Sequence, residues 1–323
     1  MSTSPSVRYQ FYDHSPDASD MYQEVLTGLQ AVPKRLPPKY FYDEEGSRLF
    51  EAITRLPEYY PTRTEMSLFD RCEQSVAEAL GNDACLVEYG SGSSQKIRKV
   101  LQRARPQAYV PVDISAEHLE LQSAALSRDF PWLKVYPTCA DFTQPFKLPE
   151  PVSELPKVGF FPGSSIGNFE PNGAVSFLRN VLQTLGPEGQ MLVGVDRKKD
   201  AAVLEAAYND DQGVTARFNL NLLHHINAQL DASFELDSFV HEARYNEALG
   251  CIQMFLRSCV AQTVVLGDHE ISFAEGETIH TENSYKYDPA EFIELARRGG
   301  FDTEDWWTDE NSWFALYLLR ATP

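Results

Sequence analysis

The chain has 323 residues, of which 43% are hydrophobic and 23% are charged, as expected for a globular enzyme with room for two domains. Its formal net charge of −19 opposes binding to the phosphate backbone of nucleic acids and to anionic membrane surfaces. We therefore expect a small-molecule substrate, and we expect neither nucleic acid nor membrane as a partner.

Several features of the sequence predict a cytoplasmic protein without a metal site. The five cysteines are odd in number, form no Cys-x-x-Cys pair and lie mostly in apolar runs, as expected for reduced core residues. Residues 1–20 are polar and contain no apolar targeting segment. No run approaches the roughly 18 apolar residues of a membrane span. The adjacent pair His224 and His225 has no third ligand nearby in the sequence, so no metal is expected.

The first part of the chain predicts helices interrupted by aromatic, proline-rich loops. Apolar spacing predicts a helix over 18–29, whereas two prolines in 36–43 argue against a helix there. Residues 46–55 are predicted to be helical, and Thr62 with Glu65 predicts a capping-box start for the next helix. The aromatic loops are expected to be packed, either as a hydrophobic cover or as a substrate lid.

A glycine-rich turn after residues 85–89 is the element around which the chain is organised. The apolar run predicts a buried strand, and Gly90 and Gly92 allow a sharp turn close to a ligand before a helix begins. The third glycine of a dinucleotide-binding turn is replaced by Gln95. Glu88, two residues before the first glycine, makes the turn resemble the first motif of class I S-adenosylmethionine (SAM) methyltransferases.

Two later strand ends carry acidic residues suited to the same cofactor. A strand over 108–114 places Asp113 at its end, about 20 residues beyond the glycines, where it can accept hydrogen bonds from ribose hydroxyls. A strand over 133–139 is followed by Asp141 and Phe142, which can bind an adenine edge and cover its face. A strand-end Asp is also a common helix cap, but the ordered set of acidic residues favours a SAM site.

Strands and helices alternate from residue 85 onward and predict a doubly wound parallel sheet. The strands are expected over 85–89, 108–114, 133–139, 157–162 and 189–195, and the helices over 95–105, 116–128 and 173–185. The loop with Gly163 and Asn168 should border the ligand cleft, because ligands bind beyond the carboxyl ends of such strands. Asn168 suits the carboxylate and amine of an amino acid, and a turn-stabilising role is equally consistent.

The alternation stops after Asp196, which predicts an insertion between core elements. Helices are expected around 203–208 and over 213–230, and strands over 239–246, 251–260, 262–266 and 270–273. A helix over 289–298 and strands over 303–307 and 313–320 then close the sheet with an antiparallel hairpin, the ending typical of methyltransferases.

Five runs, at 36–43, 54–65, 88–96, 163–168 and 281–284, together resemble the histidine Nα-methyltransferases of the ergothioneine pathway, over nearly the whole chain. The resemblance implies an α/β fold with a class I SAM-methyltransferase core, which is a Rossmann-like doubly wound sheet with an antiparallel C-terminal hairpin. It also implies a second, α+β substrate-binding domain. It implies SAM as cofactor and Nα-trimethylation of L-histidine to hercynine, and we expect a monomer. The substrate-binding domain is expected to comprise 1–63 and 199–286, and the core 64–198 and 287–323.

The resemblance also assigns site residues. Cofactor binding is expected from Glu88, Gly90, Gly92, Lys96, Asp113, Asp141 and Phe142. Substrate binding is expected from Tyr42, Phe50, Tyr59, Gly163, Asn168, Tyr208, Met254, Glu282 and Ser284. Of these, Tyr42 and Asn168 are expected to orient the amine for the reaction.

The Glu282 motif is physically consistent with an imidazole ligand. In an extended segment Glu282 and Ser284 point to the same face, where they can accept from and donate to the two ring nitrogens. Asn283 and Tyr285 differ from the smaller residues usual near this motif, which leaves the fine substrate preference open.

Three alternatives remain. A member of the same family acting on an indole-bearing or other aromatic amino acid is disfavoured by Glu282, because an indole has one N–H and no second nitrogen. A non-catalytic SAM-binding protein would not need both a cofactor set and a matched substrate set. An NAD-dependent enzyme is opposed by Gln95.

Overall fold

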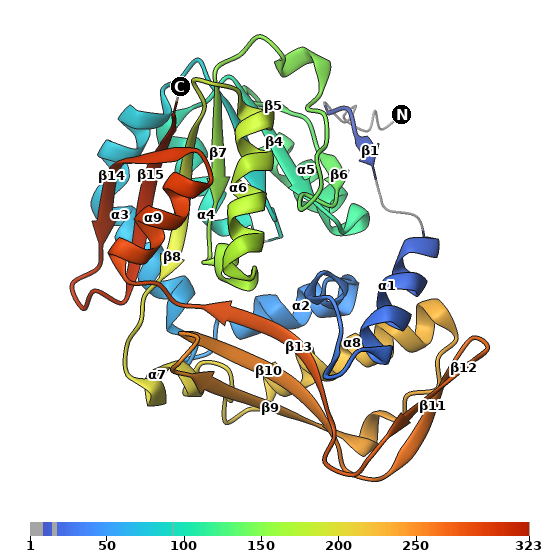
Figure 1. The fold of residues 1–323 in the computed structure, drawn as a ribbon. Helices are drawn as coiled ribbons and strands as arrows, with labels where there is room; N and C mark the ends of the chain where they lie inside the picture. Colours follow the sequence, from blue (N-terminus) through green and yellow to red (C-terminus); the bar gives the residue numbers. More distant parts are fainter. Residues whose placement is uncertain (1–8, 15–17, 93, 323) are drawn as a thin grey trace.

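The computed structural model describes residues 9–14, 18–92 and 94–322. It has two parts, a large sheet covered by helices and a smaller sheet below it, with α2 and α8 stacked between them (Figure 1). The prediction for residues 1–20 falls partly outside the described range. Within that range no helix is both long and apolar enough to cross a membrane.

The large sheet has nine strands in the order β1-β6-β4-β3-β7-β8-β15-β14, with β5 paired to β4. In this order, each pair of neighbouring strands from β1 through β6, β4, β3 and β7 to β8 is parallel. Strand β15 pairs antiparallel with both β8 and β14. The strands are β1 Tyr12–His14, β3 Cys85–Tyr89, β4 Ala108–Asp113, β5 Lys134–Val135, β6 Thr138–Ala140, β7 Lys157–Phe161, β8 Gln190–Asp196, β14 Phe301–Thr308 and β15 Phe314–Ala321. This is the predicted doubly wound sheet with a C-terminal hairpin, the class I SAM-methyltransferase fold.

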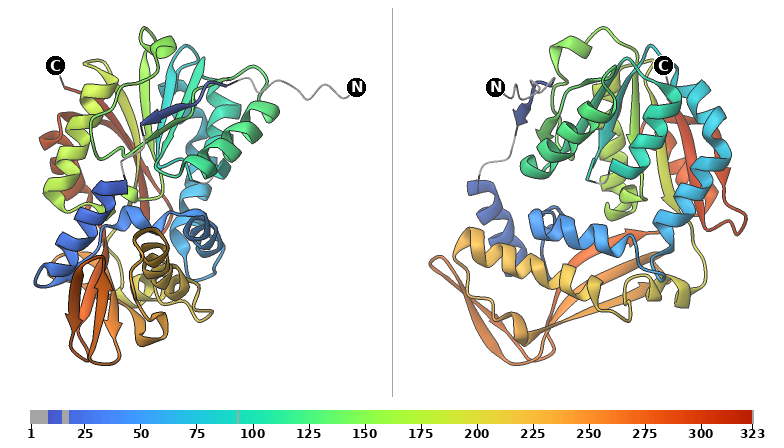
Figure 2. Two further views of the ribbon diagram at one scale, coloured as in Figure 1. Left: turned by 90° about the vertical axis from the view of Figure 1, so that its right-hand side faces the viewer. Right: turned by 180° about the vertical axis from the view of Figure 1, so that it is seen from behind.

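Helices cover both faces of this sheet, as Figure 2 shows. The central strands β3 and β4 are buried along their whole length, which explains their continuous apolar runs. One face packs against α6 and α9, and the other packs against α3, α4 and α5. These helices are α3 Tyr60–Leu80, α4 Ser94–Ala104, α5 Ala116–Asp129, α6 Pro171–Leu185 and α9 Pro289–Arg298.

The smaller sheet joins the N-terminal segment to the insertion. Its order is β2-β13-β10-β9, and β11 pairs with β12 in a separate hairpin. Phe41 of the N-terminal segment stacks on Phe218 of the insertion with ring centroids 4.5 Å apart, inside one shared apolar cluster. The elements are α1 Ala18–Gln30, β2 Lys34–Arg35, α2 Glu44–Ile53, α7 Ala201–Ala206, α8 Val214–Leu230, β9 Phe239–Asn246, β10 Cys251–Ser258, β11 Gln262–Leu266, β12 His269–Phe273 and β13 Thr278–Tyr285.

Two predictions for the N-terminal segment were wrong. Residues Pro38–Phe41 form one turn of 3-10 helix, because proline is tolerated at the first position, where no hydrogen bond is lost. Helix α3 begins at Tyr60, so Thr62 with Glu65 is not a capping box. The Glu65 carboxylate instead accepts the backbone N–H of Gly163 at 2.9 Å.

Two strand predictions also need correction. The strand expected over 133–139 is divided into β5 and β6, and Pro137, which cannot donate to a ladder, lies at the break. Residues Thr278–Tyr285 form a full strand, β13, that pairs with β10 and β2. The sequence alone predicts only an extended segment around Glu282.

Candidate active site

One cavity lies where the two sheets meet, and it gathers every residue predicted to bind the substrate. Its lining comes from α2, the loop after β7, the α7–α8 region and strands β10 and β13. The predicted residues are Tyr42, Phe50, Tyr59, Gly163, Asn168, Tyr208, Met254, Glu282 and Ser284. Ser164 and Ser165 also line it and belong to the loop predicted to border the cleft, although neither was singled out. Ile53, Ala207, Thr215 and Phe218 complete the lining and were not predicted, since nothing in their local sequence marks them.

Glu282 and Ser284 lie on the same face of β13, both buried in the cavity wall. Met254 on β10 is directly opposite Glu282 in the strand register and so shares that face. Asn168 Nδ2 donates to Glu282 Oε2 at 3.3 Å. Burial raises the pKa of Glu282 to about 7, while the nearby charge of Lys286 acts in the opposite direction. The apolar and aromatic surroundings therefore disfavour the charge of this carboxylate, which keeps acceptor capacity for a ligand.

An aromatic wall faces the carboxylate. Tyr42 meets Phe50 and Phe218 edge to face, each with ring centroids 5.9 Å apart, and Tyr59 contacts Phe50 at 6.4 Å. Burial raises the pKa of Tyr42 and of Tyr59 well above 10, so both hydroxyls stay protonated and can donate.

The residue after Tyr42, Asp43, holds the loop that carries Tyr42 in place. Asp43 Oδ1 caps α2 by accepting the backbone N–H of Gly46 at 2.7 Å, and it also accepts from Asn221 Nδ2 on α8 at 2.8 Å. These two contacts explain why the aromatic run is ordered against the insertion.

The loop after β7 holds Asn168 close to β13. Gly163 has a φ of +79° and Ser164 a φ of +64°, a left-handed pair that turns the chain sharply. At Gly167 a Cβ would lie 2.5 Å from the carbonyl oxygen of Tyr285, so only glycine permits this approach. The 3-10 turn Ser165–Asn168 then points its last residue at Glu282.

The glycine turn, Asp113 and Phe142 meet at the carboxyl ends of β3 and β4. Gly90 has a φ of +72°, and a Cβ there would lie 3.7 Å from the Phe142 ring. A Cβ on Gly92 would lie 3.9 Å from Asp113 Oδ2. Asp113 Oδ1 accepts the backbone N–H of Ser115 at 3.0 Å, so Oδ2 is the oxygen that faces the turn. This cradle fits the adenosine part of SAM.

The other predicted cofactor residues already have partners within the protein. Glu88 is buried and accepts from the Tyr109 hydroxyl, and burial raises the pKa of Glu88 to about 8. Lys96 forms an ion pair with Glu65. Asp141 accepts from Thr143 Oγ1 at 2.6 Å and from Lys39 Nζ at 3.0 Å. The cofactor roles of Glu88, Lys96 and Asp141 stay predictions.

No group of three or more His, Cys, Asp or Glu side chains among the described residues is arranged to hold a metal ion. His225, half of the histidine pair in the sequence, uses its Nδ1 to donate to the Tyr40 carbonyl at 2.8 Å. That contact ties α8 to the aromatic loop.

The sheet topology, the glycine cradle and the adjoining cavity together define a SAM-dependent methyltransferase. Residues 21–321 match the model of a family described as "Histidine-specific methyltransferase, SAM-dependent", and the chain belongs to this family.

Curated relatives agree with this membership. The chain is 40% identical over 311 residues to the histidine N-alpha-methyltransferase of Mycolicibacterium smegmatis, covering 93% of this chain and 95% of that protein. It is 42% identical over 307 residues to the histidine N-alpha-methyltransferase of Mycobacterium tuberculosis, covering 92% and 93%. It is also 27% identical over 325 residues to the 4-dimethylallyltryptophan N-methyltransferase easF of Epichloe festucae var. lolii, covering 92% and 94%.

Proposed function

We propose that this protein transfers three methyl groups, one at a time, from SAM to the α-amine of L-histidine and so makes hercynine for ergothioneine biosynthesis. The observation that carries the proposal is the pairing of Glu282 with Ser284 on one face of β13, inside a cavity whose other side chains are mostly aromatic or apolar, apart from Asn168, Thr215 and the serines of the loop after β7. A neutral imidazole has one N–H donor and one bare nitrogen, which match a carboxylate that accepts and a hydroxyl that donates.

Tyr42 and Asn168 orient the α-amine in this proposal, and the ring of Tyr208 packs beside the amino acid's backbone groups. Bound SAM supplies an electrophilic methyl group, which an amine lone pair attacks in line. Holding the amine in that line can supply up to about 7–11 kcal/mol of the barrier reduction. No strong base is needed, because an α-amine, whose pKa is about 8 at a peptide N-terminus, has a neutral fraction at cellular pH and water can take the proton.

Aromatic faces also suit the later methylation steps. The product nitrogen becomes quaternary and carries a permanent positive charge, which the face of Tyr42 can stabilise without hydrogen bonds. Phe50 and Tyr59 line the imidazole pocket in this proposal. Met254 and Phe218 exclude water from the imidazole.

For the cofactor we propose that Gly90 and Gly92 let the backbone approach SAM, that Asp113 Oδ2 accepts from the ribose, and that Phe142 covers the adenine. Glu88, Lys96 and Asp141 complete the proposed set. The geometry at Gly90, Gly92 and Asp113 supports it.

We also propose the domain division 1–63 with 199–286, and 64–198 with 287–323, which is supported by the apolar cluster that the N-terminal segment shares with the insertion. A monomer is proposed because the predicted substrate residues all come from one chain. A cytoplasmic location is proposed because the five cysteines are free.

A second candidate is methylation of an indole-bearing amino acid, as the name of the Epichloe relative suggests for that protein. Glu282 and Ser284 together argue against it, since the single N–H of an indole can pair with only one of them and leaves the buried Ser284 hydroxyl without an acceptor. The test is incubation of the purified protein with SAM and each of the twenty amino acids, followed by mass detection. We expect histidine alone to gain three methyl groups efficiently. Faster methylation of tryptophan would overturn the proposal.

A further inference from the structure

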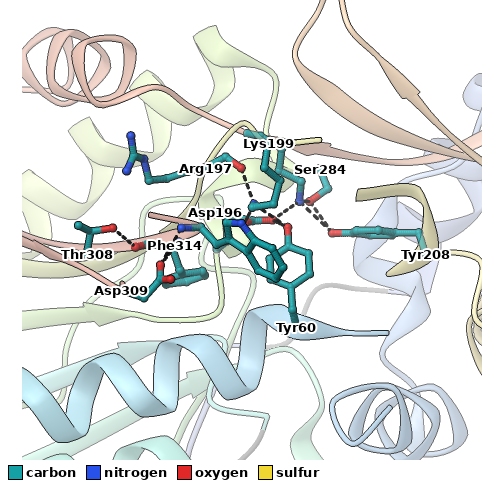
Figure 3. Close-up of polar contacts among 12 residues, drawn as sticks. Tyr60, Asp196, Arg197, Lys199, Tyr208, Ser284, Thr308, Asp309 and Phe314 are labelled. Atoms are coloured by element: carbon teal, nitrogen blue, oxygen red, sulfur yellow. Dashed lines mark hydrogen bonds and ion pairs between the residues drawn. The ribbon is translucent and has the colours of Figure 1, made fainter. Parts of the chain in front are cut away.

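A buried lysine lies directly behind the proposed histidine pocket. Lys286 is 2% exposed, and its Nζ lies 2.9 Å from Asp196 Oδ2, 2.8 Å from Ser284 Oγ and 3.2 Å from the Tyr208 hydroxyl. Figure 3 shows Asp196 next to Lys199 and the Tyr60 hydroxyl, with Ser284 and Tyr208 further to the right. An ammonium has three N–H donors and no acceptor, so these three contacts use all of its capacity.

These contacts determine what Ser284 can offer to a substrate. A hydroxyl has two acceptor lone pairs and one donor. Lys286 donates to Ser284 Oγ, and the Tyr208 hydroxyl also donates to it at 2.8 Å. A phenol oxygen conjugates one lone pair with its ring and accepts well only on the other, and Lys286 donates to that one, so Tyr208 donates to Ser284 and does not accept from it. With both lone pairs occupied, Ser284 can face the cavity only as a donor.

We propose that Lys286 is a positioning residue that fixes Ser284 as a hydrogen-bond donor and thereby makes the pocket select a neutral imidazole. The bare ring nitrogen then faces Ser284, and the ring N–H faces Glu282. This inference rests on the proposed function, because it assumes that Glu282 and Ser284 bind the imidazole. The positive charge of Lys286 also favours the ionised, accepting form of Glu282.

A purely structural role for Lys286 would be to neutralise Asp196, and the chain offers a matched control for that role. Lys199 is also buried and lies 2.5 Å from Asp196 Oδ1, on the other oxygen of the same carboxylate. Its remaining hydrogen bonds among the described residues go to the Tyr60 hydroxyl and the Arg197 carbonyl. Replacing Lys199 with methionine therefore removes a buried charge from Asp196 and leaves Ser284 unchanged.

The experiment compares kcat and KM for histidine with those for two ring analogues in which one hydrogen-bonding group is missing. Pyrrol-2-ylalanine keeps an N–H at the position of Nδ1 and has carbon at the position of Nε2, whereas thiazol-5-ylalanine keeps a bare nitrogen at the position of Nε2 and has sulfur at the position of Nδ1. In the wild type, pyrrolylalanine leaves the Ser284 hydroxyl unpaired, which should lower kcat/KM by about tenfold or more. In Lys286→Met, Tyr208 regains a free lone pair, so Ser284 can donate to it instead.

We expect Lys286→Met to reduce the preference for histidine over pyrrolylalanine by about tenfold, mainly through KM, and to leave the preference over thiazolylalanine unchanged. Lys199→Met should keep the wild-type preference on both analogues. In a Ser284→Ala background, Lys286→Met should produce no further change, because the residue through which it acts is gone.

Three results would overturn the inference. One is a folded Lys286→Met protein with the wild-type preference, and another is an equal loss of preference in Lys199→Met. The third needs no variant and applies even if Lys286→Met does not fold: a wild-type enzyme that uses pyrrolylalanine as well as histidine. Failure of the wild type to methylate histidine at all would instead refute the proposed function.

Discussion

Replacing Glu282 with glutamine should stabilise the free protein at neutral pH while it weakens histidine binding. Burial raises the pKa of Glu282 from 4.5 to about 7. The folded protein therefore holds a proton at this site more tightly than the unfolded chain, and the stability of the wild type falls as pH rises between these two values. The difference, 7 − 4.5, is roughly 2.5 pKa units, and at about 1.36 kcal/mol per unit it amounts to about 3 kcal/mol.

Glutamine has nearly the same shape and carries no charge that burial penalises. The Glu282→Gln variant should recover most of that free energy above pH 7 and almost none near pH 4.5. Urea unfolding of both proteins at pH 5 and pH 8, without histidine or SAM, measures the effect. We expect the difference in the free energy of unfolding, variant minus wild type, to be about 1–3 kcal/mol larger at pH 8 than at pH 5. Parallel pH profiles for the two proteins would show that Glu282 does not titrate in this range.

The same substitution tests the binding role. The ionised carboxylate is the stronger acceptor, and with a pKa of about 7 its fraction falls from about one half at pH 7 to about one eleventh at pH 6, so KM for histidine in the wild type should rise by about fivefold. The imidazole of histidine also titrates here, and the comparison with Glu282→Gln cancels that contribution because both proteins meet the same substrate. A gain in stability joined to a loss of binding is the trade-off expected of a functional buried charge.

Further substitutions separate the cofactor cradle from the substrate cavity. Asp113→Ala should weaken SAM binding by about 1.5–3 kcal/mol in calorimetry, whereas an unchanged affinity would reduce Asp113 to a turn cap for Ser115. Asn168→Ala should lower methylation of every accepted amino acid and leave SAM affinity intact, because the backbone groups it addresses are common to all of them. Gly167→Ala should push the Asn168 loop away from the Tyr285 carbonyl and raise KM for histidine, again with SAM affinity kept. A normal KM would mean that the loop can shift without moving Asn168.

The central sheet could be predicted because the local sequence of each long strand identifies it. Continuous apolar runs bounded by turn residues identify strands buried on both faces, and the glycines at 90 and 92 mark the turn between β3 and α4. The short strands β1 and β2 were missed, since two or three residues carry no period of their own. Their pairing depends on β6 and β13, which lie far away in the sequence.

The site was predictable through family resemblance and only partly through physics. The alternation of residues in an extended chain placed Glu282 and Ser284 together, but nothing local joins them to Tyr42 or Asn168. Glu65 was read as a helix cap because Thr62 lies three residues before it, and its partners Lys96 and Gly163 are distant in sequence. Lysine is rarely fully buried, so the burial of Lys286 could not be expected without its partner Asp196.

Asn283 and Tyr285, the two departures from the usual motif, alternate with the cavity residues and lie on the opposite face of β13. Neither lines the cavity that Glu282 shares with Ser284, although Asn283 borders a neighbouring cavity together with Glu282. Asn283 Nδ2 and the Tyr285 hydroxyl instead each donate to Glu170, at 2.8 Å. Glu170 directly precedes α6, two residues after Asn168. The larger side chains therefore act on the strand and the loop rather than on the imidazole, because they hold β13 against the segment that positions Asn168.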